Sequence, residues 1–130
     1  GDKLALVLRN YPVPQHKVAA ITAQAAEAAA LQGKFWEMHD LLYKIQASWS
    51  TSSDINGVLK DYATQTKLDL TKFNSDLNSS AVKERVQRDV TSGNGYHLPG
   101  TPTFFLNGEE MQLPITEQAL KDKINALINS

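Results

Sequence analysis

Histidine is the residue type in this sequence best suited to acid–base or metal chemistry near neutral pH. The chain has three, at His16, His39 and His97, and it has no cysteine. None of the three stands with another histidine or a glutamate at a zinc-binding spacing such as His-Glu-x-x-His. Without cysteine, the chain's own residues cannot form disulfides, thiolate metal sites or a thiol nucleophile. We therefore expect neither a metal site nor a cofactor.

The sequence around two of these histidines suggests where their side chains lie. His39 lies one helical turn after Phe35, which favours a position at the boundary of a packed helix. His97 directly precedes Leu98-Pro99-Gly100, so its imidazole could lie near a proline loop and tune a thiol there. An ordinary surface position is the simpler interpretation of His97. Serine hydrolase chemistry is discounted, because the chain has no Gly-x-Ser-x-Gly elbow.

Charge and hydropathy argue against two classes of partner. Lys and Arg number 13 against 14 Asp and Glu, and no basic face is evident, so nucleic acid is not an expected partner. The longest apolar runs, such as 4–8 and 28–31, are far shorter than the roughly 20 residues that span a bilayer.

The amino terminus shows no signal peptide. We interpret it as a processed or engineered boundary, or as the start of one part of a longer protein.

The elements that would position such residues begin with an apolar run, 3–9, which predicts a buried strand. Helix-forming composition and apolar spacings of three and four then predict five helices. Their expected ranges are 18–31, 34–47, 54 to about 63, 71–77 and 80–92. Ser52 or Ser53 is the expected cap of the third helix. Trp36 and Trp49 could line a peptide groove, but we expect Trp36 to pack between helices.

The pattern after these helices changes to extended structure. Gly-Asn-Gly at 93–95 is expected to end the last helix, and a proline loop leads to a strand at 103–106. Asn107-Gly108 predicts a type I′ turn, because both residues tolerate the positive φ that this turn needs. The second strand is expected at about 110–113, and Thr116 is expected to cap a final helix. A β-hairpin followed by a helix is therefore predicted.

Three stretches of the sequence resemble DsbA-like thioredoxin-fold proteins. Residues 100–108, Gly-Thr-Pro-Thr-Phe-Phe-Leu-Asn-Gly, look like the cis-proline loop and hairpin of that family. Residues 32–42, Gln-Gly-Lys-Phe-Trp-Glu-Met-His-Asp-Leu-Leu, resemble its inserted helical domain, and residues 8–16 resemble the strand and loop that enter this insertion. The three motifs occur in the family's order and cover essentially the whole chain.

The resemblance implies an α/β fold, an incomplete thioredoxin-like domain with an inserted helical subdomain. Its order would be strand, about five helices, β-hairpin and carboxy-terminal helix. The whole chain, 1–130, would be a single domain, with 1–15 and 93–130 in the thioredoxin core and 16–92 in the helical insertion. The family's first strand and Cys-x-x-Cys helix would precede Gly1 and are missing here. No catalytic residue is therefore expected in this chain.

What remains by resemblance is a surface for substrate. Thr101 and Pro102 would be the substrate-binding residues, joined by a cis peptide bond and offering the backbone of Thr101 to an extended peptide. Without the resemblance a trans bond would be favoured, since cis is uncommon even before proline. Gly100 and His97 are further candidate contributors from the same loop.

Two functional hypotheses follow from the resemblance. The first is that the chain is a portion of an extracytoplasmic thiol:disulfide oxidoreductase, periplasmic or membrane-anchored, acting on cysteine-containing proteins or peptides. The second is a redox-inactive module that binds peptides or a partner protein. The sequence preceding Gly1 would distinguish them, because the first hypothesis requires a strand and Cys-x-x-Cys there. Oxidase, isomerase and reductase directions stay open.

The implied sheet also has a gap, because the missing strand would lie between 3–9 and 103–106. Unpaired strand edges beside apolar side chains favour association. The two strands could collapse directly onto each other, but this would require the helical block to move, so we expect contacts with a second copy through strand addition or exchange.

Overall fold

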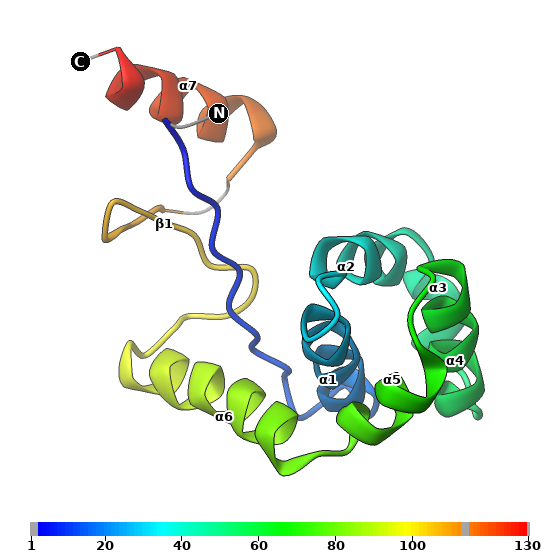
Figure 1. Cartoon of the computed structure of the whole chain (residues 1–130). Coiled ribbons are helices and arrows are strands. Elements are labelled where there is room, and N and C mark those ends of the chain that lie inside the picture. Colours follow the sequence, from blue (N-terminus) through cyan, green and yellow to red (C-terminus); the bar gives the residue numbers. More distant parts are fainter. Residues whose placement is uncertain (1–2, 113–114, 130) are drawn as a thin grey trace. The chain divides into compact units, whose positions relative to one another are not determined.

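A computed structural model describes residues 3–112 and 115–129 of the chain. Contacts divide these residues into two compact units, one containing Arg9–Asn94 and the other containing the residues up to Leu8 together with those from Gly95 onward. Figure 1 shows the helices of the first unit and the hairpin and last helix of the second. The elements are α1 (Ala19–Ala30), α2 (Phe35–Lys44), α3 (Gln46–Trp49), α4 (Ile55–Gln65), α5 (Leu70–Leu77), α6 (Ser80–Gly95), β1 (Phe105–Leu106), β2 (Glu109–Glu110) and α7 (Glu117–Ile128).

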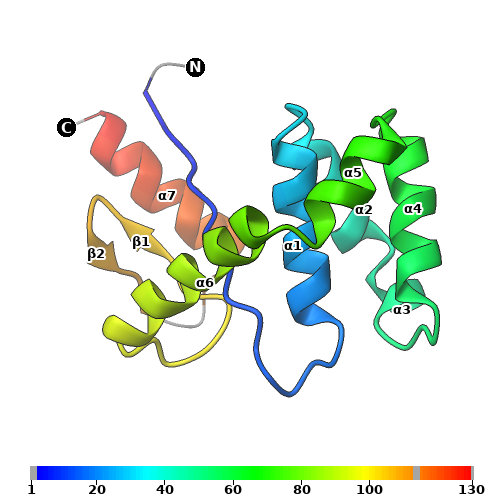
Figure 2. The same ribbon diagram turned by 60° about the horizontal axis from the view of Figure 1, so that its bottom comes forward.

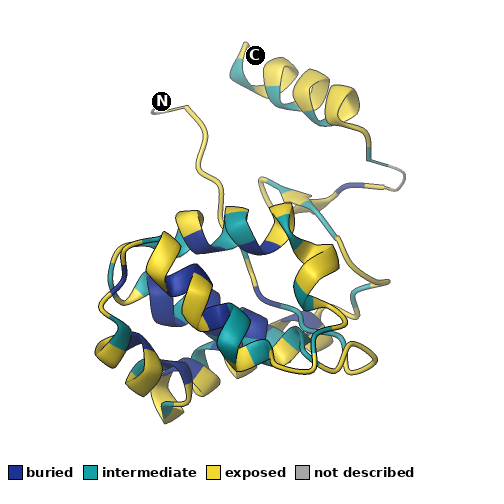
Figure 3. Cartoon of the chain, turned by 90° about the vertical axis from the view of Figure 1, so that its right-hand side faces the viewer, coloured by how far each residue is buried: buried dark blue, intermediate teal, exposed yellow. Residues whose placement is uncertain are grey.

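The core of the helical unit forms around the alanine-rich helix α1, which packs against α2, α4 and α5. Ala25, Ala28 and Ala29 are completely buried. Their short side chains let neighbouring helices approach closely, and the larger side chains fill the remaining space. The largest fully buried side chains are those of Phe73, Met38 and Leu59. Figure 3 shows the buried parts of these helices, in dark blue, mostly on the sides that face one another.

Two predicted helix boundaries in this unit are wrong. The helix expected at 34–47 is interrupted at Ile45, whose φ of −118° and ψ of 30° are not helical, so α2 ends at Lys44 and α3 begins at Gln46. The helix expected to stop at Ser92 continues to Gly95. Glycine tolerates helical dihedrals, and Gly93 is buried on α6. The Gly-Asn-Gly stretch therefore forms the last helical turn instead of ending the helix before it.

The caps of α4 and α5 are aspartates. The Asp54 carboxylate accepts a hydrogen bond from the Gly57 amide at 2.9 Å, and Asp69 accepts one from Lys72 at 2.8 Å. The expected cap of α4 at Ser52 or Ser53 is therefore wrong. Ser52 instead accepts a hydrogen bond from the Asp54 amide at 3.1 Å, just outside the helix. Asp54 is next to the first helical residue, so its carboxylate reaches the unpaired amides of the first turn.

A buried carboxylate, Asp89 on α6, holds the segment that leads into α1. The Asp89 side chain is 3% exposed and accepts hydrogen bonds from the Asn10 amide at 2.9 Å and from Arg85 Nη1 at 2.8 Å. Arg9 Nη1 lies 3.3 Å from the same carboxylate. Burial by itself would raise the pKa of Asp89, but the Asn10 amide and the neighbouring guanidinium groups outweigh it, so the pKa is lowered.

The second unit begins with residues up to Leu8, which do not form the predicted buried strand. Leu4 is 52% exposed, Leu6 73% and Val7 66%. No backbone hydrogen bond joins residues 3–8 to another described residue. A strand forms only where a second strand receives its amides and carbonyls. Residues 3–9 therefore have a high propensity for β-strand, but no strand among the described residues pairs with them.

The predicted hairpin is present, with shorter strands than expected. Phe105 pairs with Glu110 and Leu106 with Glu109 in an antiparallel register, and Figure 2 shows the two short arrows. The turn has positive φ at both central residues, 51° at Asn107 and 86° at Gly108, as the type I′ prediction requires. The expected second strand ends at Leu113, which lies outside the described residues.

Helix α7 is capped as predicted. Thr116 Oγ1 accepts a hydrogen bond from the Ala119 amide at 3.1 Å. None of the residues described in α7 is buried within its unit. The helix shares a shallow hollow with the residues at the start of the unit and the end of β1, lined by Lys3, Leu4, Leu106, Asn107, Ile124, Leu127 and Ile128.

The Asp89 arrangement predicts a measurable loss of stability. Asp89→Asn keeps the shape of the side chain but removes the charge that pairs with Arg85, so we expect the free energy of unfolding to fall by about 2 kcal/mol. Urea unfolding at neutral pH measures this change. Asp61→Asn on α4 is the matched control, because Asp61 is exposed and forms no ion pair with a described residue.

The same substitution predicts a pH dependence. A carboxyl group whose pKa is lower in the folded than in the unfolded state stabilises the fold above the unfolded pKa, about 4 for Asp. That contribution is lost as the pH falls through the lowered folded pKa. The stability difference between Asp89→Asn and the parent chain should therefore shrink under acid conditions. A constant difference from neutral to strongly acid pH would contradict the proposed ion pair.

The exposed segment and short hairpin predict self-association. Residues 3–8 present apolar side chains and form no backbone hydrogen bond with another described residue, which favours pairing with a second copy. We expect light scattering to give a mass above 14.3 kDa. Leu6→Lys should restore the monomer, because a charged side chain opposes edge pairing. Leu31→Lys, at a similarly exposed leucine of the helical unit, should not. A monomeric parent chain would contradict the prediction.

Candidate functional site

The candidate site is the loop between α6 and β1, where the bond between Thr101 and Pro102 is cis, as predicted. The side chain of Thr103 donates a hydrogen bond to the Gly100 carbonyl at 2.6 Å, closing the loop around that bond. Gly100, Thr101 and Pro102 are exposed. Thr101 and Pro102, the predicted substrate-binding residues, and Gly100, a further candidate, thus lie together on one accessible turn directly before the hairpin.

His97 lies at the beginning of the same loop. It has a positive φ of 53°, and its Nδ1 is 3.1 Å from the Gly95 carbonyl oxygen at the end of α6. The ring is therefore held towards the helix end, and no hydrogen bond connects it to the described residues 100–103. The role of His97 in tuning a thiol stays a prediction, as does substrate binding by Thr101 and Pro102.

Two aromatic side chains, one before the loop and one after it, are in contact. The rings of Tyr96 and Phe105 have centroids 5.8 Å apart, inclined at 52°. Because Tyr96 precedes the loop and Phe105 follows it, their contact brings its two ends together. Tyr96 is 70% exposed and Phe105 45%, so the pair also offers apolar surface beside the turn. The sequence reasoning missed this pair, since no spacing rule links residues 96 and 105.

The chemistry available in this loop is limited to binding. Backbone groups and the hydroxyls of Thr101 and Thr103 can form hydrogen bonds with an extended chain, but the loop holds no thiolate or other activated nucleophile. Among the described residues, no group of His, Cys, Asp or Glu could hold a metal ion. The loop therefore offers hydrogen-bonding groups but no reacting atom of its own.

The other predicted candidates lie in the helical unit. His39 is half-buried, as expected, and its Nδ1 is 2.9 Å from Asp40 Oδ1. Trp49 packs against the core and donates to the Leu42 carbonyl at 2.7 Å. The expectation that Trp36 packs between helices is wrong, because its side chain lies on the outer side of α2 and is 43% exposed. His16, in the turn before α1, is also exposed.

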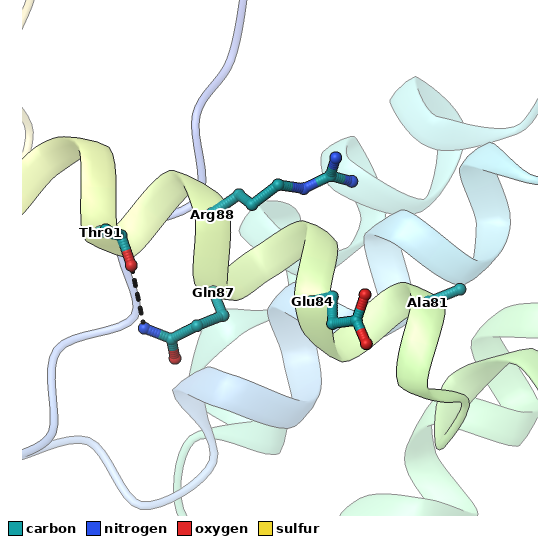
Figure 4. A pocket seen from close by; sticks show the side chains of 5 residues that line it. All are labelled: Ala81, Glu84, Gln87, Arg88 and Thr91. Atoms are coloured by element: carbon teal, nitrogen blue, oxygen red, sulfur yellow. Dashed lines mark hydrogen bonds between the residues drawn. The ribbon is translucent and has the colours of Figure 1, made fainter.

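A surface hollow of the helical unit lacks the form of a binding site. Its walls come from one helix, α6, and Figure 4 shows the side chains of Ala81, Glu84, Gln87, Arg88 and Thr91 along it. Gln87 donates to Thr91 at 3.4 Å, a long and exposed hydrogen bond. A concave site normally needs walls from several elements. This surface is open, and its residues do not converge on one point.

Nothing in the described chain is suited to cross a membrane as a helix, since no helix there is both long and apolar enough.

Comparisons with known proteins show that this chain is similar to part of several antiporters. It is 38% identical over 112 residues to the Na(+)/H(+) antiporter NhaA of Herminiimonas arsenicoxydans, covering 86% of this chain and 17% of that protein. The corresponding antiporters NhaA 3 of Salinispora tropica and NhaA 1 of Salinispora arenicola are 39% and 40% identical, over 88% and 78% of this chain. The chain spans 17% and 15% of the lengths of those two proteins.

No solved structure shows a significant match. Residues 1–126 match the family described as Thioredoxin. The helices and small antiparallel sheet accord with an incomplete thioredoxin-like α/β fold. With nearly its full length matched, the chain belongs to the thioredoxin family.

Proposed function

We propose that this chain is the Cys-free portion of a DsbA-like thiol:disulfide oxidoreductase that works outside the cytoplasm on cysteine-containing proteins. In this proposal residues 1–15 and 93–130 belong to the thioredoxin core, and residues 16–92 form the helical insertion. The loop at Thr101 and Pro102 holds an extended stretch of the substrate. The redox-active cysteine pair is contributed by residues outside this chain.

One observation carries the proposal. An exposed Gly-Thr-Pro-Thr loop leads directly into a hairpin, within a chain matched to the thioredoxin family over residues 1–126. The family match supports a redox fold, and the loop supports contact with a peptide backbone. The Tyr96–Phe105 pair adds apolar surface at the same place, which suits the side chains of an unfolded substrate.

The chemistry of disulfide exchange explains why the loop alone does not suffice. A thiolate attacks one sulfur of a disulfide, forms a mixed disulfide and displaces the second sulfur as a thiolate. A resolving thiolate then releases the product in the same way. Every step needs a cysteine sulfur, and this chain has none. The proposed contribution of the chain is therefore to hold the substrate beside a cysteine pair.

The names of the relatives concern much longer proteins. The matched part is 17% of the antiporter from Herminiimonas arsenicoxydans. The name antiporter therefore describes that whole protein and not the matched part by itself. We propose that a domain of this kind is one segment of a longer polypeptide that also contains other functional parts. We assign no transport step to the residues described here.

The absence of cysteine also favours a second candidate function. In that alternative the domain is a redox-inactive binding module that keeps the loop and helical insertion to hold a peptide or a partner protein. The coding sequence before Gly1 separates the two. A strand followed by Cys-x-x-Cys there supports the oxidoreductase, and a natural chain without that pair supports the binding module.

The first prediction from this proposal is that the 130-residue chain does not catalyse disulfide exchange. Reduction of insulin by dithiothreitol, followed by turbidity, should proceed at the rate of the protein-free control, because no thiolate is available. The matched sample is the same protein extended to include the preceding segment, which should accelerate the reaction if that segment carries the cysteine pair. Catalysis by the Cys-free chain would overturn the chemical argument.

The second prediction concerns peptide binding at the loop. An extended peptide with its cysteine carboxymethylated should shift the backbone amide signals of Thr101 and Thr103 in an NMR titration. The amides of Ser52 and Ser53, between α3 and α4 of the helical unit, are the internal control and should stay in place. Equal shifts in both regions would indicate nonspecific association and contradict a substrate loop.

A further inference from the structure

A row of aromatic side chains runs along α2 from Phe35, which packs against the core, to Trp36 and Tyr43, which are exposed. We define the aromatic face of α2 by Phe35, Trp36, His39 and Tyr43. The ring centroids of Phe35 and Trp36 are 5.1 Å apart, those of Trp36 and His39 5.2 Å, and those of His39 and Tyr43 4.7 Å. The four rings thus form a continuous row along two turns of one helix.

The opposite side of α2 attaches the helix to the core. Met38 is fully buried and Leu42 is 6% exposed, and both belong to the core cluster. Tyr43 is 68% exposed and Trp36 43%. Large aromatic side chains bury much area when they pack, so two of them left in solvent on one helix face are typical of an interaction surface.

A carboxylate accompanies these rings. Asp40 follows Trp36 by four residues and precedes Tyr43 by three, so it shares their side of the helix. Its side chain is 78% exposed, and its ion-pair partner in the described chain is His39, through a contact of 2.9 Å. Lys34, the nearest lysine at the start of α2, pairs with Glu37 at 3.0 Å. No lysine or arginine of the described residues pairs with Asp40.

This combination has a specific chemical complement. A guanidinium group stacks its flat face on an aromatic ring and donates hydrogen bonds from its edge to a carboxylate. Trp36 and Tyr43 offer the rings, and Asp40 offers the carboxylate between them. We propose that the aromatic face of α2 binds an arginine side chain presented by a partner protein.

Two other occupants fit the observations less well. A membrane interface also accepts Trp and Tyr, but an anionic leaflet would repel the carboxylates of Asp40 and Glu37. A second copy of this chain would bury the rings, but the four residues of the face include no lysine or arginine that could meet the Asp40 carboxylate of the other copy. The proposal does not depend on the redox function, because all its residues lie on α2.

The test uses the two tryptophans as reporter and control. In an NMR titration with acetyl-Gly-Arg-Gly amide, the indole N–H signal of Trp36 should shift. That of Trp49, whose indole donates to the Leu42 carbonyl, should stay in place. The lysine peptide should bind about threefold more weakly, and the citrulline peptide, which keeps the shape but lacks the charge, should bind more weakly still.

Variants of exposed residues sharpen the result. Asp40→Asn should weaken binding of the arginine peptide about threefold, with Trp36 still as the reporter. Asp61→Asn removes an exposed carboxylate from α4 and should leave the affinity unchanged. Unfolding curves of both variants should match the parent, which separates a binding defect from a folding defect. Equal effects of the two substitutions would overturn the proposal.

Outcomes that point to another occupant also overturn it. A Trp36 signal that moves on dilution without peptide would assign the face to a second copy. A Trp36 signal that responds to phosphatidylcholine vesicles, equally in the parent and in Asp40→Asn, would assign it to a lipid surface. Equal binding of the arginine and citrulline peptides would show that binding does not need the charge of the guanidinium group, which contradicts the proposal.

Discussion

The placement of the chain that enters the helical unit depends on one buried carboxylate, Asp89. Taking a carboxylate out of water is costly unless hydrogen bonds and opposite charges replace the solvent. The Asn10 amide and Arg85 do this for Asp89, while the Asn10 side chain donates to Glu27 of α1 at 2.6 Å. Two helices and the loop before α1 are thereby tied at one point. This matters for α6, which otherwise contributes few apolar side chains to the core, chiefly Val82 and Val86.

Helix α2 shows how one element serves two purposes. Its inner side, with Met38 and Leu42, fills the core beside the alanines of α1. Its outer side keeps aromatic rings in solvent, although burial would be favourable for them. Trp36 and Tyr43 lie outside the core cluster, so their exposure is compatible with a stable fold.

The second unit contains an accessible loop in a chain without cysteine. The loop at Thr101 and Pro102 is accessible and is closed by the Thr103 hydrogen bond and by the contact of Tyr96 with Phe105. These contacts are local and need no cysteine. The reacting sulfur atoms of a thiol exchange are absent from the chain. In the proposed function, this loop would hold the substrate backbone while the reacting sulfur atoms come from outside the chain.

The sequence by itself determined the features that depend on neighbouring residues. The hairpin turn at Asn107-Gly108, the Thr116 cap and most helices follow from local backbone preferences, and the loop of the candidate site was found from its motif. Tertiary structure decided the rest. Residues 3–9 have strand composition, but a strand needs a partner that local sequence does not specify. Trp36 and Trp49 have the same side chain, and only packing leaves one exposed and the other against the core. The sequence analysis did not identify Asp89, because its partner Asn10 is 79 residues away in the sequence and is brought near only by folding.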